Sequence, residues 1–141
     1  AYANLNLKKF DEALAVFKNL HAQKPQDTQV LNDMGYTYYA YTQTLWHKRD
    51  KRNLLRLQTD IRLLADQPAA GAKHFVGALR NIADATEDYR SLADFLKALA
   101  AKRPEPFFLA MAGSVLNQLH LQLQRQKSPE AAQIQTESNI Y

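Results

Sequence analysis

The sequence predicts an all-α protein built from repeated pairs of helices. Among its 141 residues, alanine and leucine dominate with 21 and 20 copies, whereas glycine occurs 4 times and proline 5 times. Helix-favouring residues are therefore abundant and turn-forming residues scarce, which argues against a β-sandwich. Apolar residues also recur at intervals of three and four, as one buried helix face requires. The length suits one domain with a single core, residues 1–141.

The first three helices are predicted from two prolines and the periodicity around them. Residues 8–24 form the first helix, which ends before Pro25 because proline ends helices or opens them. Residues 28–46 form the second helix, and residues 51–67 form the third, which ends before Pro68. The apolar face of the third helix consists of Leu54, Leu57, Ile61 and Leu64.

The fourth and fifth helices, over residues 70–85 and 87–103, meet at an acidic segment. Asp84 stands three residues before Glu87, which fits a capping box at the start of the fifth helix. The helix dipole also favours acidic groups at that end. Capping therefore accounts for Asp84, Glu87 and Asp88 better than acid–base catalysis does.

The last two helices each begin near a proline. The sixth helix, residues 106–126, opens with Pro106, and its leucines continue a helical series. The seventh helix, residues 129–139, follows Ser128, whose hydroxyl can cap it. A proline and a glutamate in its first turn support that start.

The chain repeats itself, which is the strongest indication of its fold. Five positions recur 79 residues later with the same spacing: Phe10, Ala13, Phe17, Leu20 and Pro25 match Tyr89, Leu92, Leu96, Leu99 and Pro104. Four more recur 78 residues later: Leu31, Met34, Gly35 and Tyr38 match Leu109, Ala112, Gly113 and Leu116. With a weaker copy between them, the helix pair returns about every 36–43 residues, and the units cover 8–24, 28–67, 70–103 and 106–139.

At these residues the chain resembles the tetratricopeptide repeat family. The match is good over residues 8–41, fair over 86–118 and poor over 42–85, where Leu79 replaces a glycine and Arg56 a small alanine. The resemblance implies a right-handed α-solenoid of antiparallel helix pairs, about seven helices in all. Glycine or alanine would let the paired helices approach closely.

The resemblance also implies a binding surface, because the first helix of each pair lines the concave face in this family. The implied residues are Gln29, Asn32, Tyr36, Tyr39, Ser114, Asn117 and Gln118. Such polar and aromatic side chains suit a peptide or a partner helix, although they could also be solvated or cover a neighbouring helix. Asp33 and Tyr36 interrupt the lysine, asparagine and arginine pattern with which some members clamp a carboxylate, so we do not expect that specificity.

The net charge of +4 is concentrated between His47 and Arg56. This basic patch consists of Lys48, Arg49, Lys51, Arg52 and Arg56, against the single Asp50, whereas the other residues carry 13 basic and 13 acidic groups. On one continuous helix Lys48, Arg52 and Arg56 would share a face, whereas a turn near Asp50 would spread them around a corner. The patch suits an acidic protein, nucleic-acid phosphates or an anionic membrane surface, unless it is only a solvated helix corner.

The densest aromatic cluster runs into this patch. It consists of Tyr36, Tyr38, Tyr39, Tyr41 and Trp46. Tyr38 and Tyr41 share one helix face while Tyr36 and Tyr39 lie on another, so one pair is expected in the core.

No motif in the sequence favours catalysis. There is no cysteine, so thiolate nucleophiles, disulfides and cysteine-bound zinc are excluded. The four histidines fall in different predicted helices without a metal-ligand spacing, and no glycine-rich phosphate loop occurs. We therefore expect no enzyme activity, no cofactor and no metal.

The predicted function is a non-enzymatic protein–protein interaction scaffold. A peptide or partner helix would bind the concave face, and the basic patch would attract an acidic partner. The alternative is a nucleic-acid-binding helical module that uses Trp46 and the patch. A third hypothesis is support of a neighbouring enzyme or outer-membrane assembly domain, with homo-oligomers formed through a solenoid end.

Neither a stretch of roughly 18–20 apolar residues nor a signal segment occurs, which leaves cytoplasm and periplasm open. The glutamine and alanine content suggests a bacterial protein. Because the chain starts at Ala1 within a repeat, we expect it to be a piece of a longer protein.

Overall fold

Seven α-helices make up the described chain. The computed structural model describes the backbone of residues 2–66 and 72–141 and the side chains of residues 7–66 and 73–141. The helices are α1 (Tyr2–Gln23), α2 (Thr28–His47), α3 (Lys51–Ala65), α4 (Ala72–Thr86), α5 (Tyr89–Lys102), α6 (Pro106–Arg125) and α7 (Ala131–Ile140). These residues contain no strand, which confirms the all-α class and the number of helices.

The start of α1 is the one helix end that lies far from its predicted position. The helix begins at Tyr2 rather than at residue 8, because the preceding residues contain no proline or glycine to interrupt it. The other described ends lie within two residues of the prediction. The predicted limits at Gln67 and Ala70, and Pro68 between them, lie outside the described residues.

Aspartate side chains cap three helices. Asp27 accepts a hydrogen bond from the Gln29 amide of α2, and Asp50 accepts one from the Asn53 amide of α3. Asp88 caps α5 by accepting from the Ser91 amide at 3.1 Å. Each carboxylate thus satisfies an amide that the first helical turn leaves unpaired.

The predicted capping box at Asp84 is wrong. Asp84 lies inside α4, where it forms an ion pair with Arg80 at 3.3 Å. The reason is Glu87, whose φ of 60° is left-handed and does not continue a right-handed helix. The chain therefore turns after α4, and Asp88 is the residue placed to cap α5.

Two other non-glycine residues with left-handed backbone also follow helices. Arg49 has φ 57° and Lys127 has φ 56°. After α6, the Ser128 amide donates to the Leu123 carbonyl at 2.9 Å, and the Lys127 amide donates to the Gln124 carbonyl, which together form a Schellman motif. The Ser128 hydroxyl accepts from the Glu130 amide at 3.3 Å, but the predicted cap is wrong, because Pro129 and Glu130 form a turn and α7 begins only at Ala131, with Glu130 as its N-cap and no side-chain cap.

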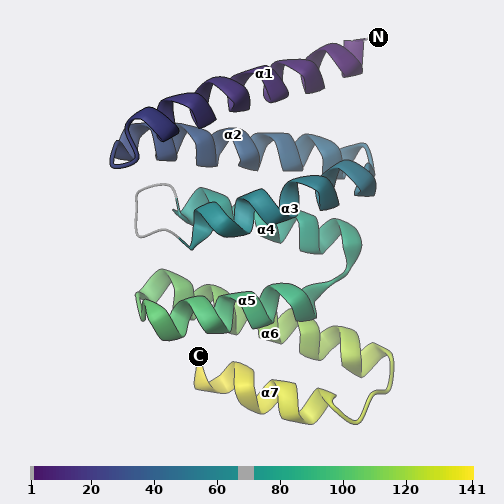
Figure 1. Cartoon of the computed structure of the whole chain (residues 1–141). Coiled ribbons are helices and arrows are strands. Elements are labelled where there is room, and N and C mark those ends of the chain that lie inside the picture. Colours follow the sequence, from purple (N-terminus) through teal and green to yellow (C-terminus); the bar gives the residue numbers. More distant parts are fainter. Residues whose placement is uncertain (1, 67–71) are drawn as a thin grey trace. The chain divides into compact units, whose positions relative to one another are not determined.

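The chain divides into two compact units, Ala1–Thr86 and Glu87–Tyr141. In the first unit α2 packs against α1, α3 and α4, and α3 also packs against α4. In the second unit α6 packs against both α5 and α7. Consecutive helices within each unit run in opposite directions (Figure 1). A single domain over the whole chain stays a prediction.

The core of the first unit gathers on α2, α3 and α4. Its largest fully buried side chains are Leu31, Met34, Tyr38, Tyr41, Leu45, Leu54, Ile61, Phe75, Leu79 and Ile82. The burial of Tyr38 and Tyr41 confirms that one face of the aromatic cluster belongs to the core. Among polar groups, buried Asn81 of α4 donates to the Thr42 hydroxyl at 3.1 Å and thereby joins α4 to α2.

The second unit is held together by α6. Its buried side chains include Phe108, Ala112, Val115, Leu116 and Leu119 of α6 and Leu92, Leu96 and Leu99 of α5. Gly113 of α6 permits close approach of α7, because a Cβ atom there would lie 3.2 Å from the Cβ atom of Tyr141. His120 Nδ1 donates to the Ala131 carbonyl oxygen at 2.6 Å, which fixes the start of α7 on α6.

Candidate functional site

The predicted binding residues of the first unit lie on α2, and Tyr36 is the most prominent of them. Its side chain is 60% exposed although it is large and aromatic. Its ring meets the His74 ring of α4 edge-on, with the centroids 5.8 Å apart and the planes at 87°. Because Tyr36 and His74 belong to different helices, this contact spans the junction of α2 and α4 and presents an aromatic surface there.

Tyr39 lies one turn further along α2 and is only half-exposed. Its ring covers Gly77 of α4, where a Cβ atom would lie 3.0 Å from Tyr39 Cδ2. Its backbone carbonyl accepts a hydrogen bond from Asn81 Nδ2 at 3.3 Å. Tyr39 thus contributes to helix packing, and its ring borders the surface that Tyr36 and His74 form.

The remaining two predicted residues of α2 supply amides near Tyr36. Asn32 is half-buried one turn before Tyr36 on the same helix face. Gln29 is exposed, and its Nε2 donates to Asp33 Oδ1 at 2.9 Å. We call the five residues Gln29, Asn32, Tyr36, Tyr39 and His74 the α2–α4 surface.

The other three predicted binding residues lie on α6, in the second unit. Ser114 and Asn117 are exposed, and Gln118 is half-buried. Their helix buries Val115 and Leu116 toward the core, so these polar residues take the opposite side of the helix.

The basic patch does not lie on one helix, because a turn separates α2 from α3. Arg49 takes the left-handed conformation, and the Asp50 amide donates to the Leu45 carbonyl at 2.9 Å, which ends α2. Asp50 then caps α3, and its carboxylate also accepts from Asn53 Nδ2 at 2.7 Å. The sequence left open whether the cations share one helix face or spread around a corner, and the structure shows the corner.

At this corner Lys48, Arg49, Lys51 and Arg52 are exposed. Within the part of the chain that the structure describes, no hydrogen bond or ion pair engages the side chains of Arg49, Lys51 or Arg52. The single acid of the block, Asp50, is occupied by Asn53. We call the four cationic residues the basic corner, and the charges of Arg49, Lys51 and Arg52 in it face solvent.

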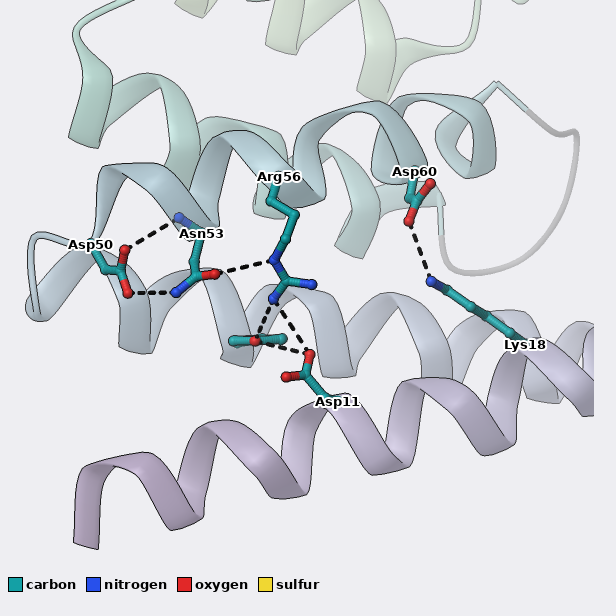
Figure 2. A network of polar contacts seen from close by, with 7 residues as sticks. Asp11, Lys18, Asp50, Asn53, Arg56 and Asp60 are labelled. Atoms are coloured by element: carbon teal, nitrogen blue, oxygen red, sulfur yellow. Dashed lines mark hydrogen bonds and ion pairs between the residues drawn. The ribbon is translucent and has the colours of Figure 1, made fainter. Parts of the chain in front are cut away.

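Arg56 belongs to the predicted patch by sequence but to a different set of contacts in space. Its Nη2 donates to the Tyr41 hydroxyl at 3.0 Å and lies 3.6 Å from Asp11 Oδ1 (Figure 2). Its Nε donates to Asn53 Oδ1 at 3.1 Å. The guanidinium thus joins α3 to α2 and α1, so it is less available to a partner than the four residues of the basic corner.

Tyr41 stands at the centre of this network. Its hydroxyl donates to Asp11 Oδ1 at 3.0 Å, and its ring stacks on Phe10 of α1 with centroids 4.9 Å apart. Burial, together with the hydrogen bond to the Asp11 carboxylate, raises the pKa of Tyr41 to about 12. The phenol is therefore kept neutral and serves as a fixed link between α1 and α2.

A second polar link joins α1 to α3. Lys18 Nζ donates to Asp60 Oδ2 at 3.3 Å (Figure 2). Burial lowers the pKa of Lys18, but the neighbouring Tyr38 and Asp60 raise it by more, so the net shift is upward. Burial has the opposite effect on the Tyr38 phenol, because it raises the pKa of that group. With both pKa values raised, Lys18 is charged and Tyr38 is neutral at neutral pH.

Trp46 adds an aromatic side chain next to the basic corner. Its side chain is 37% exposed, and its ring stacks on the His47 ring with centroids 6.0 Å apart and planes at 17°. The pair offers a flat aromatic face beside the cations, a combination that suits ligands with both rings and negative charge.

The described residues contain no group of three or more histidine, aspartate or glutamate side chains placed to hold a metal ion. Among the described helices, none has both the length and the apolar character needed to cross a membrane.

Sequence reasoning missed His74, which is the α4 member of the α2–α4 surface, and Gly77, which the Tyr39 ring covers. Both fall in residues 42–85, where the repeat pattern is weakest. A histidine and a glycine three residues apart on the predicted fourth helix are a signal only once the pairing of α4 with α2 is known.

Comparisons of the chain with protein-family models, with curated proteins and with solved structures gave no match.

Proposed function

We propose that this chain is a non-enzymatic protein-interaction module with a helical-repeat fold similar to tetratricopeptide repeats. The packing of α2 against α1, α3 and α4 supports this proposal, since it is the pattern expected if α2 and α4 are first helices of successive pairs. The close approach of α7 at Gly113 also supports it, since small residues at that position suit the family's pairing. In this arrangement, a right-handed solenoid, α2 and α4 would line the concave side.

The observation that carries the proposed function is the exposed Tyr36, edge-on to His74 on the neighbouring helix. A large aromatic side chain that is mostly exposed gains free energy when a partner covers it, and such residues often anchor interfaces. Asn32 and Gln29 supply amides beside it that can bond to a peptide backbone. The ligand that fits is an extended peptide or a partner helix with an apolar side chain to place against Tyr36.

The basic corner lies at the other end of α2 from Gln29. It would attract an acidic segment of the same partner and raise the association rate more than the affinity. The mechanism is thus binding by a preformed surface, steered by charge.

The test uses peptides selected from a random displayed library against the whole chain. The dissociation constant of a selected peptide is measured for the natural chain, for Tyr36→Ala and for Val16→Ala. Val16 is a matched control because it lies on α1 and is 58% exposed, close to the 60% of Tyr36. We expect Tyr36→Ala to weaken binding by about ten-fold or more, as loss of an interface anchor does.

Nuclear magnetic resonance locates the same peptide. We expect its addition to shift the amide signals of Asn32, Tyr36 and His74 while those of α1 stay in place. Circular dichroism shows whether Tyr36→Ala keeps its helices. Unchanged affinity in a folded Tyr36→Ala variant, or shifts confined to other helices, would refute the α2–α4 surface.

A second candidate function, single-stranded nucleic-acid binding, is favoured by Trp46 and the basic corner. A base could stack on the Trp46 and His47 rings while the cations hold phosphates. If the chain binds single strands, its affinity for a fluorescent oligonucleotide should fall steeply as the salt concentration rises. This affinity should be lost in Trp46→Ala.

A further inference from the structure

The outer face of α3 carries two exposed leucines. Leu55 is 52% exposed and Leu63 is 66% exposed, although α3 packs against α2 and α4 through another face. That inner face consists of Leu54, Leu57, Ile61 and Ala65, all buried. A helix with a buried stripe and a second apolar row leaves that second row for a further contact.

The residues around the two leucines form a symmetric row. Leu55 and Leu63 stand four residues before and after Thr59, and Arg52 and Asp66 stand seven residues before and after it. At 3.6 residues per turn all five fall within about 80° of the helix circumference. All five are exposed, and Arg56 and Asp60 contact α1 beside the row (Figure 2). We call these five residues the α3 row.

An antiparallel copy of the same row complements it in both size and charge. With Thr59 opposite Thr59 of the second copy, Leu55 lies beside the second copy's Leu63, and Arg52 lies beside its Asp66. Each contact occurs twice because a two-fold axis repeats it. Packing of this kind buries four leucines and pairs two opposite charges at each end.

We propose that two copies of this chain associate through their α3 rows, antiparallel and about a two-fold axis at Thr59. One helix pair buries less than the roughly 1,200–2,000 Å² of stable interfaces, so the dimer dissociates on dilution. The proposal uses none of the residues of the α2–α4 surface, although it shares Arg52 with the basic corner; its row lies on α3 and its C-cap residue Asp66.

The absence of cysteine provides a direct test of the register. Thr59→Cys places one thiol on the proposed axis, where the two Cα atoms can reach the roughly 4.4–6.8 Å that a disulfide needs. With oxidised glutathione, we expect a disulfide-linked dimer to form about ten-fold faster than in Ala15→Cys, because association raises the local thiol concentration. Ala15 is the matched control, since it is exposed on α1 and lies outside the row.

Charge reversal tests the ends of the row, with sedimentation velocity over a range of concentrations as the readout. Arg52→Glu should shift the chain to monomer, and adding Asp66→Arg should restore the dimer. Equal cross-linking of Thr59→Cys and Ala15→Cys would overturn the proposal. So would dimerisation of Arg52→Glu at the same concentrations at which the natural chain dimerises. Binding of the monomer to anionic lipid vesicles, lost in Leu63→Gln, would instead assign the leucines to a membrane surface and also overturn it.

Discussion

At the scale of single residues, Tyr41 shows how one side chain can hold three helices. Its ring stacks on Phe10 of α1, and its hydroxyl donates to Asp11 while accepting from Arg56 of α3. The side chain is 1% exposed, so leaving its hydroxyl without a partner would be costly. The aromatic ring and the hydroxyl therefore have separate roles, packing and linkage.

The raised pKa of Tyr41 predicts a loss of stability at high pH. In the folded chain the pKa is about 12, against about 10 in the unfolded chain, so the stabilisation is fully present below pH 10. It is lost as the pH rises from 10 to 12 and amounts to at most about 2–3 kcal/mol, because solvent screens the half-exposed Asp11 and Arg56. Tyr41→Phe keeps the ring, so this variant should show a smaller fall in the free energy of unfolding over that range.

Urea denaturation at pH 8, 10 and 12 measures this difference. Tyr36→Phe, at an exposed tyrosine, is the control and should follow the natural chain. At neutral pH the Tyr41→Phe variant should be less stable by about 1 kcal/mol, the net value of a hydrogen bond. An identical pH dependence in Tyr41→Phe and the natural chain would contradict the assignment.

At the scale of elements, α7 depends on its contacts for its existence. It has 10 residues, fewer than an isolated helix needs in water. Ala131 and Ile134 are its buried residues. Two ion pairs add to the docking of α7 on α5: Lys97 with Glu137 at 2.8 Å and Arg90 with Glu130 at 3.0 Å. The hydrogen bond with Glu137 raises the pKa of Lys97, so Lys97 stays charged at neutral pH.

Ile134→Ala should therefore release α7. Removal of this buried side chain costs about 2–4 kcal/mol of docking energy, after which so short a helix does not persist. Hydrogen exchange measured by mass spectrometry should show loss of amide protection over residues 131–140, with α6 still protected. Ile140→Ala is the matched control, because Ile140 is 77% exposed and should leave protection unchanged. Equal protection in both variants would show that other contacts hold α7.

At the scale of the whole molecule, the charge is unevenly distributed. The net charge of +4 equals the charge of the block between His47 and Arg56. Since Arg56 pairs with Asp11, the exposed cations that remain in that block are those of the basic corner. A local field of this kind steers acidic ligands without changing the fold.

Reversal of the basic corner should thus affect binding more than the same change elsewhere. The variant Arg49→Glu, Lys51→Glu, Arg52→Glu should reduce the association rate of a fluorescent polyglutamate peptide by about ten-fold at low salt. The control variant reverses Lys9, Lys24 and Lys127, exposed residues on other segments, and gives the same net charge. Equal rates for the two variants would show that net charge alone matters. Arg56 is left unchanged, because its replacement would disturb the network with Tyr41 and Asp11.

The sequence by itself determined the helices of this protein, because prolines and apolar spacing are local signals. It placed the described boundaries within two residues except at the start of α1, and it separated the buried pair Tyr38 and Tyr41 from Tyr36 and Tyr39. It did not determine which residues after α4 cap α5. That depended on the left-handed turn at Glu87. Glycine is the residue that would indicate such a conformation in a sequence, and this position holds a glutamate.

Only the tertiary structure decided how the candidate site is divided. Tyr39 covers Gly77, and Arg56 turns to Asp11, because α4 and α1 pack against α2. Those partners stand 38 and 45 residues away along the chain. Periodicity determines which face of a helix is apolar, but the identity of what meets that face depends on contacts between segments far apart in sequence. For that reason Tyr36, His74 and the basic corner are candidates for partner binding, while Tyr39 and Arg56 also hold the fold together.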